Sequence, residues 1–268
     1  PHVLIAERFL FGAVVFGVVA AARGQVTRPS LSDLGRYAAL AAAMVGFFLL
    51  MFESLRYTDS VTTGALFTLL PLMTAVSARV IVGQQTRPQQ WLLMCGGALG
   101  ASVVVFDGDW QRAVQLDLGV GAWIFLAGLV CFSLYAPLVS RLHRGESAVV
   151  MTLWTLILGL VLLVAVSAPQ ALAINWSEVP LEVHAGIAYL GIINTAVTFM
   201  LVKYAGTRIP SAKVMAYTFL TPVFVVLLEG ALGRGWPALI VWGGLAVTVA
   251  ATAAFAFSRV AAPAPTSR

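Results

Sequence analysis

The chain has 268 residues, of which 60% are hydrophobic and 10% are charged, and its formal net charge is +5. This number of polar residues is too small to cover the surface of a soluble globule of this size. The composition therefore excludes a soluble domain and predicts a polytopic membrane protein. The apolar runs are about twenty residues long and do not alternate in ten-residue segments, so the spans are expected to be α-helices and not barrel strands.

Nine apolar spans are predicted, separated by short polar or turn-rich segments. None of these segments is long enough to hold a folded soluble domain, so the protein is expected to act within the bilayer. In chain order the predicted spans are Val3–Ala22, Leu34–Phe52, Val61–Val82, Trp91–Phe106, Leu118–Leu142, Ala148–Ala168, Val183–Val202, Ser211–Leu232 and Trp236–Phe257.

Two of these spans share a pattern. Ser60 opens an apolar run with Pro71 inside it, and Ser211 and Pro222 repeat this arrangement 151 residues later. The match predicts two copies of one helical unit. Matching proline-interrupted segments in the two halves of a membrane protein are typical of a transporter's binding site. The alternative is coincidence, because prolines are common in transmembrane helices.

The basic residues lie mainly on one set of alternate connecting segments. Translocated segments are depleted of Lys and Arg, so the richer set and the C-terminus are predicted to be cytoplasmic. The charges are scattered over separate short segments, which argues against a nucleic-acid partner. The cytoplasmic set is Arg23, Arg28, Arg36, Arg87, Arg141, Arg144, Lys203, Arg208, Lys213, Arg259 and Arg268, and the opposite set is Arg56, Arg112 and Arg234.

The charge pattern also predicts that the two copies are inverted. The turn at 53–59 before the Pro71 segment is expected outside, and the turn at 203–213 before the Pro222 segment is expected inside. Inverted units require an odd number of spans each. We therefore expect two repeats of five helices, 1–106 and 118–258, with the first span of the native protein missing before Pro1. The alternative is a protein of nine spans with an incomplete repeat.

Segments 54–105 and 201–252 resemble the second parts of two EamA domains, the repeat units of the drug/metabolite transporter (DMT) superfamily. The motifs Pro210-Ser211-Ala212 and Pro222-Val223-Phe224 and the glycine-rich helices that follow carry the resemblance, and Arg8-Phe9-Leu10 is similar to the family near the start. In place of the family's Gly-Glu turn the chain has Gly83-Gln84 and Gly233-Arg234, and Asp59 replaces the first copy's proline.

The resemblance implies a ten-helix secondary transporter of a bacterial cytoplasmic (inner) membrane that works by alternating access. Such transporters commonly export amino acids or related small metabolites, and the superfamily includes bacterial aromatic amino-acid exporters. The expected partners are a small-molecule substrate and membrane lipids, without a cofactor. No metal is expected, since Cys95 and Cys131 lie in separate spans and no histidine has ligand spacing.

The substrate site is expected around the two prolines. Proline removes a backbone donor and frees the carbonyl four residues earlier, here Phe67 and Thr218. Asn194 and Thr198 share a helical face, and Phe132 and Tyr135 could form an aromatic wall. The alternatives are a packed kink with threonine hydroxyls bonded to their own helix, and packing roles for the asparagine and the aromatic rings. The candidate substrate-binding residues are Phe67, Thr68, Pro71, Phe132, Tyr135, Asn194, Thr198, Tyr217, Thr218 and Pro222.

Glu229 lies well inside a predicted span, and an intramembrane acid is a candidate for proton coupling. It could instead pair with Arg234 or Arg112 near the outer turn. Two other function classes remain open. A membrane scaffold or sensor would need no transport cavity, and an intramembrane enzyme would need a nucleophile and base at bilayer depth, for which the few ionisable residues offer little.

Overall fold

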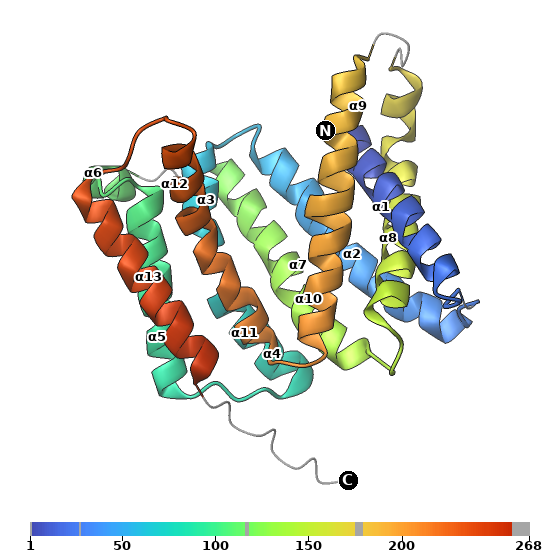
Figure 1. Cartoon of the computed structure of the whole chain (residues 1–268), viewed down its shortest axis with the longest axis horizontal. Coiled ribbons are helices and arrows are strands. Elements are labelled where there is room, and N and C mark those ends of the chain that lie inside the picture. Colours follow the sequence, from blue (N-terminus) through green and yellow to red (C-terminus); the bar gives the residue numbers. More distant parts are fainter. Residues whose placement is uncertain (1, 27, 116–117, 175–178, 259–268) are drawn as a thin grey trace. The chain divides into compact units, whose positions relative to one another are not determined.

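The structure is a computed structural model, and it describes residues 2–26, 28–115, 118–174 and 179–258. Three of the basic residues counted above, Arg259, Arg268 and the side chain of Arg112, lie outside this description. The described residues form helices joined by turns, without a strand among them (Figure 1). The elements are α1 (His2–Ala22), α2 (Leu31–Ser54), α3 (Ser60–Phe67), α4 (Leu70–Val82), α5 (Pro88–Val105), α6 (Trp110–Val114), α7 (Val120–Leu142), α8 (Ala148–Leu172), α9 (Leu181–Tyr189), η2 (Leu190–Val197), α10 (Thr198–Gly206), α11 (Ser211–Ala216), η3 (Tyr217–Leu220), α12 (Thr221–Ala231) and α13 (Leu239–Phe257).

The predicted fold class is confirmed: this is an all-α polytopic membrane protein. Within the described residues, seven helices are long and apolar enough to cross a membrane, or eight if the bent pair α3 and α4 counts as one span. The remaining predicted span corresponds to α5, an 18-residue helix that begins with the polar stretch Pro88-Gln89-Gln90.

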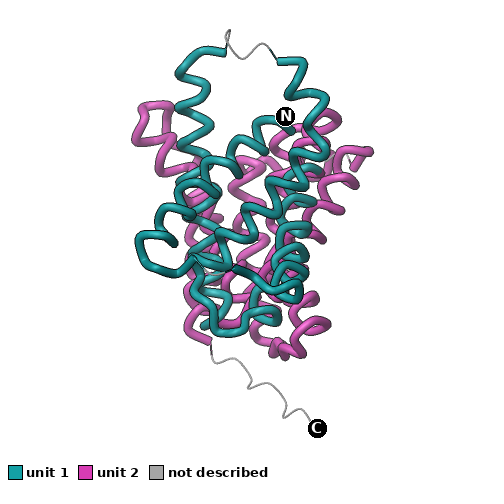
Figure 2. Tube along the Cα trace, turned by 90° about the vertical axis from the view of Figure 1, so that its right-hand side faces the viewer, with its two compact units in different colours: residues 1–49, 138–208 teal, residues 50–137, 209–268 magenta. Residues whose placement is uncertain are grey.

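The chain forms two compact units, coloured separately in Figure 2. Unit 1 comprises residues 1–49 and 138–208, and unit 2 comprises residues 50–137 and 209–268. In unit 1, α1 packs against α8 and against η2, and in unit 2, α5 packs along α13 while α4 packs against α11. Each unit therefore combines segments from both halves of the sequence.

Both proline segments are broken helices, as the sequence predicts. Pro71 is the second residue of α4, which is bent by 43° from α3, and Pro222 is the second residue of α12, which follows the 3₁₀ turn η3. Proline at the start of a helix is tolerated because the missing N–H has no intrahelical partner there. One expected detail is wrong: the Thr218 carbonyl is not left open, because the 3₁₀ turn lets it accept the Thr221 N–H.

A third irregular segment lies in unit 1, where η2 is a π-helix between α9 and α10. It contains no proline, and the sequence did not predict it. Gly191 in η2 lies against α1, since a Cβ there would lie 2.7 Å from the Arg8 carbonyl oxygen. The π-turn thus lies in close backbone contact with a neighbouring helix, as small residues allow. Single π-turns inside α-helices are frequent at functional sites.

Glycines also fix the packing of α5 on α13 in unit 2. A Cβ at Gly100 would lie 2.5 Å from Thr248 Oγ1 and 2.7 Å from the Gly244 carbonyl oxygen, and a Cβ at Gly244 would lie 2.9 Å from the Gly100 carbonyl oxygen. The two backbones therefore touch directly, as small residues allow between membrane helices. Gly97 similarly makes room for the Phe219 ring, which would lie 2.9 Å from a Cβ at that position.

Candidate functional site: an apolar cavity in unit 2

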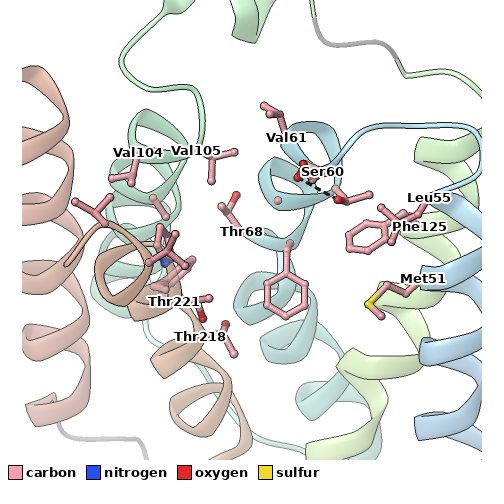
Figure 3. A pocket seen from close by; sticks show the side chains of 18 residues that line it. Met51, Leu55, Ser60, Val61, Thr68, Val104, Val105, Phe125, Thr218 and Thr221 are labelled. Carbon is pink, nitrogen blue, oxygen red and sulfur yellow. Dashed lines mark hydrogen bonds between the residues drawn. The ribbon is translucent and has the colours of Figure 1, made fainter. Parts of the chain in front are cut away.

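Unit 2 contains a cavity of about 520 Å³ beside its two broken helices (Figure 3). Small-molecule sites usually have volumes of about 300–1,000 Å³. We call it the apolar cavity. The residues that line it are Met51, Leu55, Ser60, Val61, Thr63, Gly64, Phe67, Thr68, Ala101, Val104, Val105, Phe125, Thr218, Phe219, Thr221, Pro222, Val225 and Val226.

The two broken helices bring their irregular turns to this cavity. α3 and the turn after it contribute Phe67 and Thr68, while η3 and α12 contribute Thr218 and Pro222. Thr68 and Thr218 are both labelled around the opening in Figure 3. Four of the ten predicted substrate-binding residues thus lie on its wall. Among the described lining residues there is no charged side chain, so the polar contacts available come from serine and threonine hydroxyls and from backbone groups.

The threonine hydroxyls are oriented by their own helices. Thr68 Oγ1 donates to the Ala65 carbonyl at 2.7 Å, and Thr218 Oγ1 donates to the Met215 carbonyl at 2.6 Å. This is the local bonding that the sequence left as an alternative. These hydroxyls can still bind a ligand, since each has one hydrogen and two acceptor lone pairs. The lone pairs of these two oxygens can therefore accept a hydrogen bond from a ligand N–H or O–H.

Aromatic rings form part of the wall and the layer behind it. Phe67 and Phe125 line the cavity. The Phe67 ring lies 6.2 Å from that of Phe132, and Phe132 lies 6.5 Å from Tyr135, both centroid to centroid. Tyr135 is fully buried. Phe132 and Tyr135 therefore stand behind the Phe67 ring and are not among the lining residues.

The remaining predicted site residues lie elsewhere. Pro71 is buried in α4, and Tyr217 in η3 is 50% exposed and absent from the cavity wall. Asn194 and Thr198 belong to unit 1, where both are exposed, and Thr198 Oγ1 donates to the Ile193 carbonyl at 3.2 Å. Asn194 lies in the π-helix η2, and Thr198 is the first residue of α10 after it.

Glu229, the candidate for proton coupling, forms an ion pair near the end of α12. Its Oε1 lies 2.8 Å from Nη1 of Arg234, and the two side chains are 46% and 64% exposed. This is the pairing with Arg234 that the sequence left open. The carboxylate is not among the residues that line the apolar cavity.

Two buried cations in unit 1 were missed by the sequence analysis as functional candidates. Arg8 is 5% exposed, donates from Nε and Nη2 to Thr195 Oγ1 at 3.1 and 2.8 Å, and lies over the Phe48 ring. Lys203 was predicted to lie in a connecting segment, but it is a buried residue of α10. The signal for Arg8 was available, because an arginine inside an apolar run is costly without a partner.

The family comparison covers nearly the whole chain: residues 1–106 and 119–257 match the model of the EamA-like transporter family. An uncharacterized transporter of Bacillus subtilis, YyaM, is 27% identical over 188 residues, which cover 70% of this chain and 62% of that protein. The chain thus spans about three fifths of the length of that relative. A probable terminal-alkyne amino-acid exporter of Streptantibioticus cattleyicolor is 26% identical over 247 residues, or 89% of this chain and 78% of the exporter.

The fold also resembles a solved structure, described only as the crystal structure of a protein. The match has a TM-score of 0.76 and 20% sequence identity, and it covers 96% of this chain and 87% of the other. At this identity the similarity concerns the arrangement of the helices alone.

Proposed function

Since the chain belongs to the EamA-like transporter family, we propose that this membrane transporter exports amino acids or related small metabolites across the cytoplasmic membrane of a bacterium. One observation carries the proposal: the apolar cavity of unit 2 is lined by the irregular turns of both proline-broken helices. A break in a helix can free backbone groups from their intrahelical partners, and such groups are then available to a ligand.

The lining favours a substrate with an uncharged, apolar portion. Phenylalanine, valine, leucine and methionine side chains form most of the wall, and the described lining residues carry no charge. A charged side chain would lose its hydration there without an ionic partner. The oxygens of Thr68 and Thr218 can accept from an ammonium or amide N–H, so an amino acid with an apolar side chain fits this chemistry. A relative described as a probable amino-acid exporter supports the same class.

Alternating access and the repeat architecture belong to this proposal. The helices of the two halves begin at matching positions, with Ser211 and Leu239 each 151 residues after Ser60 and Pro88. This agreement supports repeats at 1–106 and 118–258, and the family match is divided in the same region. We propose that the repeats are inverted and that the C-terminus is cytoplasmic, on the strength of the Lys and Arg distribution.

Counterflow in proteoliposomes tests the proposal. Vesicles with the purified protein are loaded with an unlabelled amino acid and diluted into the same labelled compound, and uptake is compared across leucine, phenylalanine, glutamate and lysine. We expect transient accumulation of leucine or phenylalanine and none of glutamate or lysine. Protein-free vesicles provide the background. Accumulation of no amino acid above that background would contradict the proposed substrate class, and preference for glutamate or lysine would contradict the assignment of the apolar cavity.

A further inference from the structure

Unit 1 contains a second cavity, of about 670 Å³, whose character is opposite to that of the apolar cavity. It lies where α1 and α10 end and α8 begins. We call it the basic cavity. Its lining residues are Arg23, His143, Gly145, Glu146, Ser147, Ala148, Val149, Met151, Met200, Lys203, Tyr204, Thr207 and Arg208.

Three basic side chains from different places in the sequence line the basic cavity. Arg23 follows α1, Lys203 is in α10, and Arg208 follows α10. Lys203 is 1% exposed, so its position is fixed by the residues packed around it. The Arg208 guanidinium carbon lies 3.6 Å from the centre of the Tyr204 ring, and its Nη1 donates to the Tyr204 carbonyl at 3.1 Å. Stacking on the Tyr204 ring therefore holds the Arg208 side chain in place.

The acid on the wall is already engaged. Among the described lining residues, Glu146 carries the carboxylate, and one of its oxygens accepts from Arg36 Nη1 at 3.0 Å. The other accepts from the Arg144 backbone N–H at 2.7 Å. Arg36 also donates to the Leu142 carbonyl and to Asp33. Glu146 thus serves a bonded network behind the wall, and the lining keeps an excess of positive charge.

The start of α8 borders the same cavity. Ala148 and Val149, the first residues of this 25-residue helix, line the wall, and the Ser147 side chain caps the helix by accepting the Val150 N–H at 3.3 Å. The first N–H groups of a helix lack intrahelical partners, and the helix dipole is positive at this end. Together with the three basic side chains, this is an environment that can bind a phosphate group.

We propose that the basic cavity of unit 1 binds a phosphate group, with Lys203 and Arg208 as its principal ligands. The excess positive charge on the lining matches the charge of a phosphate, and arginine and lysine are the side chains that bind phosphates most readily. The phosphate belongs either to a free solute or to the headgroup of an anionic lipid. The site is separate from the apolar cavity, and its existence does not depend on the proposed transport activity.

Two binding measurements on the full chain test the proposal and separate the two sources. In detergent, thermal unfolding is followed by tryptophan fluorescence as inorganic phosphate replaces chloride at constant ionic strength. In nanodiscs, native mass spectrometry compares retention of phosphatidylglycerol with that of phosphatidylcholine. Both are applied to the wild type, Lys203→Met, Arg208→Gln and the matched control Arg56→Gln. Arg56 is an exposed arginine of unit 2 that pairs with Glu53.

We expect the wild type and Arg56→Gln to bind the phosphate-bearing probe equally, and both cavity variants to bind it at least about tenfold more weakly, since a hydrogen bond to a charged group contributes about that factor. Selective stabilisation by inorganic phosphate identifies a free solute, and selective retention of phosphatidylglycerol identifies a lipid. Arg208 is exposed, so Arg208→Gln remains informative even if Lys203→Met fails to fold. If Arg208→Gln binds both probes as tightly as Arg56→Gln does, the proposal is overturned.

Discussion

The two cavities of this protein are built from different parts of its helices. The apolar cavity of unit 2 is lined by the turns that interrupt two proline helices, and its polar groups are hydroxyls such as those of Thr68 and Thr218. The basic cavity of unit 1 is lined by the ends of helices and the segments between them, and its polar groups are charged. Helix ends reach the interface, where charge costs little, whereas interrupted helix centres offer only neutral groups cheaply.

Arg8 is the exception that clarifies this division. It lies inside α1, yet it is bonded twice to Thr195 and stacked 5.0 Å from the centre of the Phe48 ring. Arg8 thus has partners on two other elements of unit 1, η2 and α2. The lining of the apolar cavity has no ionic partner for a charged side chain, which is why we expect the substrate's side chain to be uncharged.

The largest effect is expected where backbone contact fixes the wall of the apolar cavity. α5 contributes Ala101, Val104 and Val105 to that wall, and Gly100 in α5 touches the backbone of α13. Gly100→Ala would place its Cβ 2.7 Å from the Gly244 carbonyl oxygen, so the helices must separate. We expect a loss of about 1–3 kcal/mol in the free energy of unfolding, measured by thermal or denaturant unfolding in detergent.

Gly243→Ala is the matched control, because a Cβ at Gly243 meets no atom within 4 Å. Alanine is favoured over glycine inside a helix, so this variant should be as stable as the wild type or slightly more stable. Equal unfolding of the two variants would show that α5 and α13 do not cross as closely as described.

The next effect concerns the neutral polar groups of the apolar cavity. Thr218→Val keeps the shape of the side chain but removes the hydroxyl oxygen as an acceptor. We expect the apparent KM for the transported amino acid in counterflow to rise about tenfold, the effect of losing a hydrogen bond to a charged donor. Thr74→Val is the control, since Thr74 donates to the Leu70 carbonyl in the same way but does not line the cavity. An equal KM in both variants would remove Thr218 from the substrate site.

A smaller effect is expected from the acid of the basic cavity. Partial burial acts to raise the pKa of Glu146, but the backbone N–H groups and Arg36 outweigh it, so the pKa lies below its ordinary value. A lowered folded-state pKa gives stability that is present above the unfolded pKa, about 4.5, and is lost as the pH falls through the folded value. On acidification, the unfolding temperature of the wild type should therefore fall more than that of Glu146→Gln.

At neutral pH we expect Glu146→Gln to cost about 1 kcal/mol, because it removes one charged partner from a partly buried bonded network. Glu53→Gln, which affects an exposed pair with Arg56, should cost less. If both variants follow the wild type at every pH, then Glu146 does not hold Arg36 as the distances indicate.

The sequence predicted those features that depend on local chemistry. Pro71 and Pro222 break their helices because proline lacks an N–H wherever it is placed, and long apolar runs are helical in a membrane because nothing else bonds their backbone. The π-helix at 190–197 had no such local signal, and the contact of its Gly191 with α1 is visible only in the structure. Lys203 was misplaced for the opposite reason: its charge suggested a connecting segment, whereas packing buries it in α10.

Only part of the lining of the apolar cavity was predicted from the sequence. Phe67 and Thr218 lie beside prolines and were found from spacing, but Phe125, Val104 and Val105 reach the cavity only through the packing of α5 and α7 in unit 2. Tyr217, one residue from Thr218, is half exposed and absent from the wall, because successive side chains of a helical turn point in different directions. Local spacing thus identifies the broken segments, and tertiary packing selects which of their residues form the wall.

The smallest effect on stability is expected at Glu229, which tests whether a charge outside both cavities takes part in transport. The ion pair with Arg234 is solvent-exposed, so Glu229→Gln and Arg234→Gln should each change the free energy of unfolding by less than about 0.5 kcal/mol. Transport separates the two variants. If Glu229 carries a coupling proton, Glu229→Gln removes the dependence of export on an imposed pH gradient, whereas Arg234→Gln, which breaks the same pair but keeps the carboxylate, retains it. If both variants keep that dependence, Glu229 does not carry the coupling proton and only forms the exposed ion pair.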